Sequence, residues 1–508
     1  MATTRKNVYA LGGDWADPIL WYAKAVAAMK AEALNAPTSW RFYGAIHGFD
    51  KGLWTQLGYL SAGDTLPTQA QQDEFWQQCQ HGTWYFLPWH RGYLLAFEAN
   101  IRAQIVKLGG PADWALPYWN YFNAGENALP PAFASPNWPG GVGNNPLYVP
   151  QRYGPANNGS VFVPPASVNL KAMNDSKFTG VANGGSKGFG GADTGFSHSA
   201  STFGGLENQP HNMVHTMVGG QQGQLPGLMS DPDTAGLDPI FWLHHANIDR
   251  LWEVWNENPT THVDPTDPNW LNGPGTVGGG NFVMPMPDGT SWTYKPSQMT
   301  SLTALGYTYD DLSPQATGRT HAQRLNMLGF KMPAAALAAG VPPMAAPHNV
   351  ELVGASPSGV SLGGDSTQVS VAMDKTTRQK ISASLTPSAG EAQPDKVFLN
   401  LENIRGTSDA NAYDVYVGVP EGAKPLDHPE LLAGSFSLFG IRKASKPDGE
   451  HGGQGLTVTI EITEIVDQLH LGKRLDVEAL HVWVVAADGA DKGAKVTVGR
   501  ISIYRQGK

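Results

Sequence analysis

Cysteine, long apolar runs and clustered positive charge are all scarce in this sequence. The 508 residues include one cysteine, Cys79, so no disulfide can form within the chain and metal sites built from thiolates are excluded. No stretch approaches the roughly 18 apolar residues of a membrane span. The formal net charge is -10 and lysine and arginine form no run, which argues against nucleic acid or a membrane as a partner.

The start of the chain has no recognisable secretion signal. Arg5 and Lys6 are basic, but no apolar segment follows them. We therefore expect a cytoplasmic protein, with export by a partner protein or through a removed leader as the alternative.

Capping residues and apolar spacing predict helices in the first part of the chain. Asp17 as N-cap with Pro18 begins one, a second starts at about Pro88, and Asp238 with Pro239 begins a third. Between the second and third, residues 123–205 are rich in Gly, Pro, Asn and Ser, which indicates long surface loops.

The pattern changes after residue 332. Residues 333–347 are nearly all Ala, Pro, Gly, Val and Met, which is typical of a linker. Beyond them, apolar residues alternate with period two in segments 397–401, 413–417, 456–462, 480–485 and 496–504. We predict an α+β protein with a mainly α-helical domain over residues 1–332, a linker over 333–347, and an all-β, sandwich-like domain over 348–508, with an antiparallel barrel as the alternative.

Histidines in the first part of the chain are spaced like metal ligands. His211 and His215 are four residues apart, so on a helix both imidazoles face one side. His244 and His245 are adjacent in the third predicted helix, roughly 100° apart around its axis, so one of them can point at a common centre. His47, His81 and His90 lie in the earlier aromatic segments.

Neutral imidazole suits copper, zinc, iron and nickel. A zinc hydrolase is the natural competitor, but the residue after His211 is Asn212, where zincins place the glutamate that acts as general base. A purely structural role for the histidines would leave their clustering unexplained.

Two segments resemble the tyrosinases, catechol oxidases and hemocyanins, a family with a coupled pair of coppers. Residues 81–98, HGTWYFLPWHRGYLLAFE, look like the first copper signature, and residues 238–252, DPIFWLHHANIDRLW, look like the second. The resemblance continues through 267–271 and the Tyr307-Thr308-Tyr309 motif to about residue 330. Residues 412–417 and 433–436 are more weakly similar to the C-terminal domain of latent plant polyphenol oxidases.

The resemblance implies a four-helix bundle holding two copper ions, with dioxygen as co-substrate. The first copper would be bound by His47, His81 and His90, and the second by His211, His215 and His245. His244 would lie beside the ligands without binding copper. Asp249 would orient a ligand imidazole, or else pair with Arg250 or another base.

Further roles follow from the same resemblance. Cys79 is implied to form a thioether with His81, which would fix that ring; the alternative is a buried, unmodified thiol. Glu207 and Asn212 match the pair that is proposed in the family to hold the water that takes the phenolic proton; the alternative is an ordinary loop carboxylate and a surface amide.

The implied activity is hydroxylation of monophenols and oxidation of o-diphenols to o-quinones, with small phenols as substrates. A catechol oxidase limited to diphenols and a hemocyanin-like oxygen carrier are the alternatives. The C-terminal domain is expected to pack on the catalytic domain and keep the enzyme latent, with Phe436, Leu438 and Phe439 as candidates for a plug. A generic interaction module is the competing role for that domain.

Overall fold

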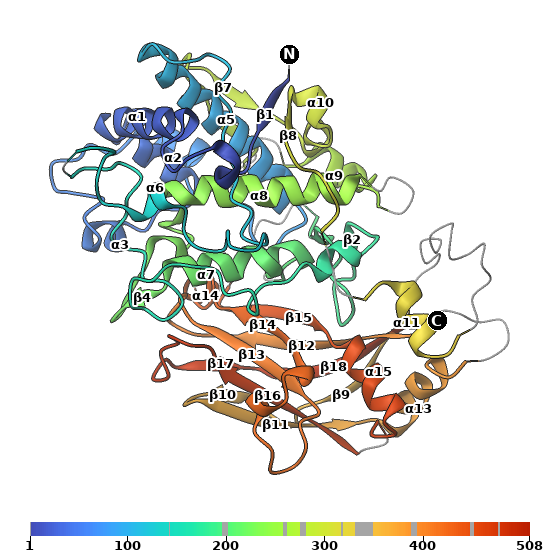
Figure 1. The fold of residues 1–508 in the computed structure, drawn as a ribbon. Coiled ribbons are helices and arrows are strands. Elements are labelled where there is room, and N and C mark those ends of the chain that lie inside the picture. The colour runs from blue at the N-terminus through green and yellow to red at the C-terminus, as the bar shows by residue number, and fades with distance from the viewer. Residues whose placement is uncertain are drawn as a thin grey trace.

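The computed structural model describes residues 2–141, 143–195, 202–257, 262–274, 281–315, 319–330, 349–387, 394–447, 452–475 and 478–507. The predicted linker 333–347 lies outside them, so the linker and the domain limits stay predictions. Figure 1 shows a helical part stacked on a β-rich part. No helix among the described residues is both long and apolar enough to cross a membrane.

Five helices in the helical part position the histidines or support them. They are α1 (Asp17–Ala31), α2 (Trp40–His47), α5 (Phe86–Lys107), α7 (Met213–Gly219) and α8 (Pro239–Asn256). The predicted start of α8 is confirmed, because the Asp238 carboxylate accepts from the amide of Ile240 at 3.0 Å and Pro239 follows it. The predicted N-cap of α1 is wrong by one residue, because the carbonyl of Ala16 already accepts from the amide of Leu20.

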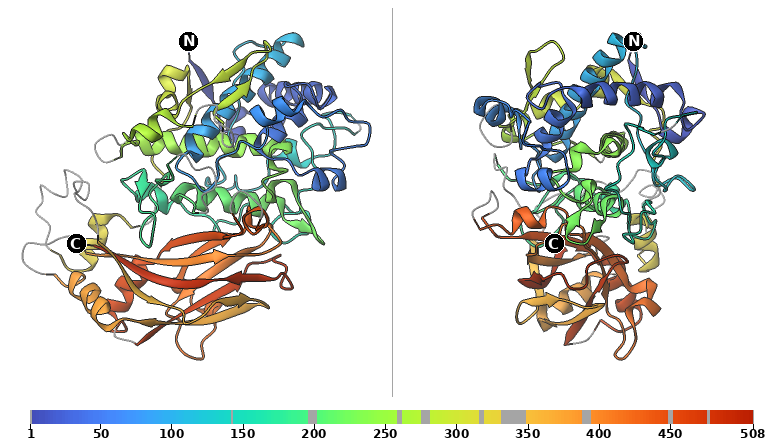
Figure 2. Two further views of the ribbon diagram at one scale, coloured as in Figure 1. Left: turned by 180° about the vertical axis from the view of Figure 1, so that it is seen from behind. Right: turned by 90° about the vertical axis from the view of Figure 1, so that its left-hand side faces the viewer.

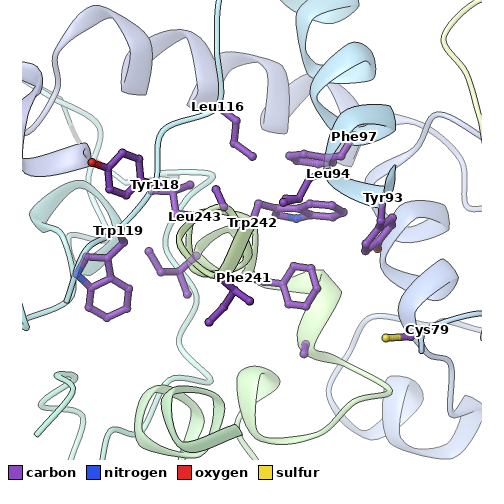
Figure 3. Packing of buried hydrophobic residues seen from close by; sticks show 14 of the residues in the cluster. Cys79, Tyr93, Leu94, Phe97, Leu116, Tyr118, Trp119, Phe241, Trp242 and Leu243 are labelled. Carbon is purple, nitrogen blue, oxygen red and sulfur yellow. The ribbon is translucent and has the colours of Figure 1, made fainter. Parts of the chain in front are cut away.

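Aromatic side chains fill the space between α5 and α8. The rings of Phe97 and Trp242 stack with their centroids 3.4 Å apart, and Tyr93 contacts Trp242 from the same helix as Phe97 (Figure 3). Helix α5 also packs on α1, whereas α2 packs mainly on the short turn η5 (Ala235–Leu237). A four-helix bundle in the strict sense therefore stays a prediction.

The β-rich part is built on one antiparallel sheet of eight strands in the order β14-β13-β16-β11-β9-β18-β12-β15. The strands are β9 (Asn349–Ala355), β11 (Ser366–Met373), β12 (Lys396–Ile404), β13 (Ala412–Val417), β14 (Leu432–Ser437), β15 (Leu456–Glu461), β16 (Ala479–Ala486) and β18 (Arg500–Gly507). The edge strands β14 and β15 approach each other, so this single sheet curls as in the barrel alternative and does not form two packed sheets. The segment 496–504 divides into β17 (Val496–Val498), which pairs with β10 (Val360–Leu362), and β18.

The prediction of an all-β C-terminal domain is wrong in one respect. Three helices accompany the sheet: α13 (Lys375–Ser384), α14 (Ile441–Ala444) and α15 (Thr463–Leu471). Helix α15 buries Ile465, Val466 and Leu469, whose spacing of three or four residues gives the helix one apolar face. Helix α11 (His321–Met327) packs with the same β-rich core through Leu325.

The two parts meet along the edge strand β14, which lies against α7 and the preceding π-helical segment η3 (Glu207–Asn212) (Figures 1 and 2). The turn after β14 and the short helix α14 reach into the helical part at this edge. This contact brings the C-terminal part to the histidines.

Candidate metal centre

Three histidine nitrogens converge at the ends of α7 and α8. The Nε2 of His215 lies 3.1 Å from that of His211 and 3.4 Å from that of His245, and His211 Nε2 lies 3.3 Å from His245 Nε2. His211 and His215 share one face across the start of α7, as their spacing predicts. All three side chains are buried.

A second group forms between α2, α5 and the loop before α5. His47 ends α2, His90 lies in the first turns of α5, and His81 precedes that helix. Ligand atoms of these three residues and of Cys79 all lie within 4.8 Å of one another. The two groups are neighbours, because the rings of His90 and His245 stack with centroids 4.4 Å apart.

Backbone carbonyls fix the orientation of several of these rings. The Nδ1 atoms of His47, His90 and His215 lie 2.7, 2.8 and 2.7 Å from the carbonyl oxygens of Pro232, Phe86 and Met229. A carbonyl only accepts, so Nδ1 carries the proton and Nε2 presents a lone pair. Burial lowers the pKa of His47 to about 4 and lowers the pKa of the other five predicted ligands well below the ordinary value, which keeps all six neutral.

Neutral imidazoles that aim Nε2 lone pairs at one another repel unless a cation lies between them. Nitrogens bound to one metal ion at about 2.0–2.1 Å lie about 3.3–3.6 Å apart, close to the separations of His211, His215 and His245. In the group of His47, His81 and His90, the buried Nε2 of His47 has no hydrogen-bond partner among the described residues. Both donor sets therefore fit a metal ion such as copper.

The two adjacent histidines of α8, His244 and His245, point in different directions. His245 Nε2 joins His211 and His215, whereas the ring of His244 stacks beside His211 at a centroid distance of 5.3 Å. His244 is nevertheless close enough to be counted with that group of potential ligands. His245 stays the predicted ligand of the pair, because its Nε2 lies 3.3 Å from that of His211 and 3.4 Å from that of His215.

Of the two roles considered for Asp249, the contacts of its carboxylate match pairing with a base and not the orientation of a ligand imidazole. The carboxylate accepts from Arg91 Nε at 2.5 Å, from Arg5 at 3.2 Å and from the hydroxyls of Tyr307 and Tyr309 at 2.7 and 2.5 Å. The two arginines hold its pKa below the ordinary value despite burial. The carbonyls described above orient the imidazoles instead, and the network joins α5, α8 and the Tyr307–Tyr309 strand β8.

Glu207 and Asn212 are both buried, Asn212 beside His211 and Glu207 beside the segment that carries His81. Glu207 Oε1 accepts from the amide of Gly82 at 2.8 Å, and burial raises the pKa of its carboxyl well above the ordinary value. Asn212 Oδ1 lies 2.8 Å from His211 Nδ1. Among the described residues, Glu207 Oε2 and Asn212 Nδ2 have no hydrogen-bond partner, so each can bind a water molecule.

Of the three plug candidates, Phe439 alone contacts the histidines. Its ring stacks on His215 with centroids 4.2 Å apart and meets the rings of His81 and His211 edge to face at 5.5 and 5.9 Å. Phe436 instead stacks on Tyr413, and both Phe436 and Leu438 belong to the β-rich core.

The sequence did not predict the contacts that residues before and after Phe439 make with the helical part. Ser437 Oγ donates to the carbonyl of Asn212 at 3.0 Å, and Gln209 donates to the carbonyl of Ser435 at 2.8 Å. Arg442 pairs with three aspartates of the helical part. No sequence pattern predicts a contact between residues over 200 positions apart, so these contacts become visible only in the folded structure.

Comparison with known proteins identifies the family to which the chain belongs. Residues 37–258 match the model of the common central domain of tyrosinase, and residues 349–506 match a domain of unknown function, DUF7868. The chain is 32% identical to the tyrosinase HcTyr1 of Hahella sp. (strain CCB-MM4) over 99% of each chain. It is 26% identical to a chloroplastic polyphenol oxidase of Malus domestica, over 82% of this chain and 65% of that one.

Solved structures extend the likeness to the whole fold. A latent aurone synthase superposes with a TM-score of 0.60 at 20% identity, covering 100% of this chain and 90% of that one. Latent apple tyrosinase gives a TM-score of 0.57 at 22% identity, covering 99% and 97%. From the full-length Hahella relative and the tyrosinase central domain, the chain belongs to the tyrosinase and polyphenol oxidase family of oxidoreductases, which use a dicopper centre.

Proposed function

We propose that this protein is a tyrosinase, which uses dioxygen to hydroxylate monophenols and to oxidise o-diphenols to o-quinones. The observation that carries the proposal is the meeting of two buried, neutral histidine groups. His47, His81 and His90 would hold one copper, and His211, His215 and His245 the other. Bound there, a copper pair supplies electrons to dioxygen and recovers them from the phenol.

Glu207 and Asn212 support the monophenolase step. A phenol has an unperturbed pKa of about 10, so a base must take its proton before the ring can be hydroxylated. The unpaired Oε2 of Glu207 and Nδ2 of Asn212 are suited to hold a water molecule that relays this proton. The raised pKa of Glu207 makes its carboxylate a stronger base than an exposed one.

Cys79 is positioned for the proposed thioether with His81. Its Sγ lies 3.4 and 3.6 Å from the two ring nitrogens of His81, so it is nearly equidistant from them. Forming the C–S bond removes the thiol hydrogen and one ring hydrogen, and dioxygen would accept the two electrons and two protons. The cross-link would fix the ring of His81, for which the described residues supply no backbone carbonyl partner like those of His47 and His90.

The C-terminal domain would keep the enzyme latent. The Phe439 ring lies against ligands of both groups, where a phenol ring would have to approach. A small phenol therefore reaches the coppers only when the turn after β14 moves away.

Copper analysis and oxygen uptake test the function. We expect copper-loaded protein, once its C-terminal domain is displaced, to consume dioxygen with both tyrosol and catechol. Uptake with catechol alone would favour the diphenol oxidase, and reversible oxygen binding without turnover would favour an oxygen carrier. Copper-free protein after metal loading would contradict the proposal as a whole.

A further inference from the structure

The Phe439 ring that shields the histidines is carried by a turn of the main chain between β14 and α14. Strand β14 ends at Ser437, and Gly440 takes a positive φ of 84° before α14 begins. A β-carbon at Gly440 would lie 3.6 Å from Pro232, so this turn runs along the surface of the helical part. The approach to the histidines therefore accommodates a peptide chain as well as a ring.

Polar groups of the catalytic domain hold the residues before the ring. The Gln209 amide donates to a main-chain carbonyl, that of Ser435, four residues before Phe439. The carbonyl of Asn212 accepts from the hydroxyl of Ser437, two residues before it. The first of these contacts would be available to any extended polypeptide, and the second to one with serine or threonine at that position.

Three carboxylates hold the residue after the ring. The Arg442 guanidinium lies 2.5 Å from Asp231, 3.2 Å from Asp50 and 3.7 Å from Asp233, all in the catalytic domain. Its fourth acidic neighbour, Asp409, comes from the C-terminal domain. The side chain of Asp231 is 1% exposed and that of Asp233 is 6% exposed, so the guanidinium fills a formed site.

These three catalytic-domain carboxylates lose their countercharge when the shield leaves. In the part of the chain that the structure describes, their ion pairs are all with bases of the C-terminal domain: Arg442, Lys443 and Lys446. Withdrawal of the domain uncovers an acidic site. Its distance from the coppers matches the spacing of Phe439 and Arg442, which are three positions apart in the chain.

We propose that Asp50, Asp231 and Asp233 form a specificity subsite of the opened enzyme, and that among tyrosine-containing polypeptides it prefers those in which arginine or lysine follows the tyrosine three residues later. The proposal rests on the tyrosinase function above and names a substrate class for the same site. The reaction balances as one phenol ring plus one dioxygen giving one o-quinone and one water. The basic residue would occupy the place of Arg442, and the tyrosine ring that of Phe439.

The test uses the copper-loaded full chain carrying Phe439→Gly and Arg442→Glu, which remove the plug and repel the three aspartates. Its substrates are the peptide Ser-Phe-Ser-Leu-Tyr-Gly-Ile-Arg and versions ending in Ala or Glu, with tyrosol as the small reference. We expect kcat/KM to be about twofold to fivefold higher for the Arg peptide than for the Ala peptide, because a partly exposed ion pair contributes on this scale. The preference should shrink in high salt.

A catalytic-domain variant separates the acidic site from the coppers. Adding Asp50→Asn should lower the ratio of Arg-peptide to Ala-peptide turnover, and comparison within one variant cancels changes in overall activity. Turnover of tyrosol without turnover of any peptide, or with equal turnover of the Arg, Ala and Glu peptides, would overturn this proposal alone. No turnover of either tyrosol or catechol would overturn the proposed function and this proposal with it.

A second measurement does not need an opened enzyme. In the full chain with Phe439→Tyr, the native turn itself presents a phenol to the coppers. We expect mass spectrometry of the 433–446 region to find a dioxygen-dependent gain of one oxygen atom with loss of two hydrogen atoms. An unmodified ring in copper-loaded protein under air would refute the claim that a backbone-borne phenol reaches the site.

Discussion

Replacing the Phe439 ring should release the enzyme from latency. In the closed state the ring is 1% exposed and stacks on His215, and in an opened state it would face water. Burying a phenylalanine stabilises the closed state by about 1.5–3 kcal/mol, and an aromatic pair adds about 0.5–1.5 kcal/mol. Phe439→Ala should therefore raise the opened fraction by roughly 30-fold to 1,000-fold, since each 1.4 kcal/mol is tenfold.

Oxygen uptake with catechol by the copper-loaded full chain measures this change. Phe436→Ala is the matched control, because Phe436 is equally buried but stacks on Tyr413 within the β-rich core. We expect strong activation from Phe439→Ala and little from the control, although both variants lose stability. Equal activity of Phe439→Ala and the unaltered protein, at equal copper content, would refute the reasoning.

Three other changes test the site. Glu207→Gln should lower tyrosol turnover by about 100-fold relative to catechol turnover, the scale of lost general base catalysis, and an unchanged ratio of the two rates would exclude Glu207 as the base. His245→Ala should leave one copper ion per chain where His244→Ala leaves two, as measured by metal analysis; the reverse result would exchange the roles of the doublet. Asp249→Asn should cost about 3–5 kcal/mol of stability, because Arg5 and Arg91 keep their buried charges, and Asp288→Asn at an exposed turn is the control for thermal unfolding. Because the folded-state pKa of Asp249 is lowered, its contribution is complete above its unfolded value and is lost as pH falls through the folded value, so acidification should destabilise the unaltered protein more than Asp249→Asn.

Helices and strands that depend on neighbouring residues were predicted from the sequence. Asp238 and Pro239 fix the start of α8, and the i, i+4 spacing of His211 and His215 places both rings on one face, because caps and helical periodicity depend on neighbours in sequence. The strands β12, β13, β15 and β16 follow from period-two alternation. Helix α15 was not predicted, because its run TEIVDQLHL begins almost directly after the end of strand β15 with no turn signal between them.

Long-range contacts could not be predicted in the same way. The sequence offered Asp249 as a partner of a ligand imidazole, but Arg5 reaches it from a position 244 residues away and Tyr307 from one 58 residues away. The alternation in β14 could not tell Phe436 from Phe439, because only the turn at Gly440 decides which ring leaves the β-rich core. These outcomes depend on tertiary packing, which propensity does not encode.

Covalent linkage explains how a few contacts can hold the shield closed. The segment around Phe439 is held by one aromatic ring, two neutral hydrogen bonds and the partly exposed pairs of Arg442, Lys443 and Lys446, and would bind only weakly as a separate peptide. Within one chain, however, the segment faces its site at an effective concentration on the order of millimolar. A weak, tethered inhibitor closes the site and yet leaves promptly once the tether is cut, so cleavage between the domains should activate by dilution of the shield. The same weakness allows a polypeptide substrate with a basic residue to occupy the vacated aspartates without meeting a tightly bound competitor.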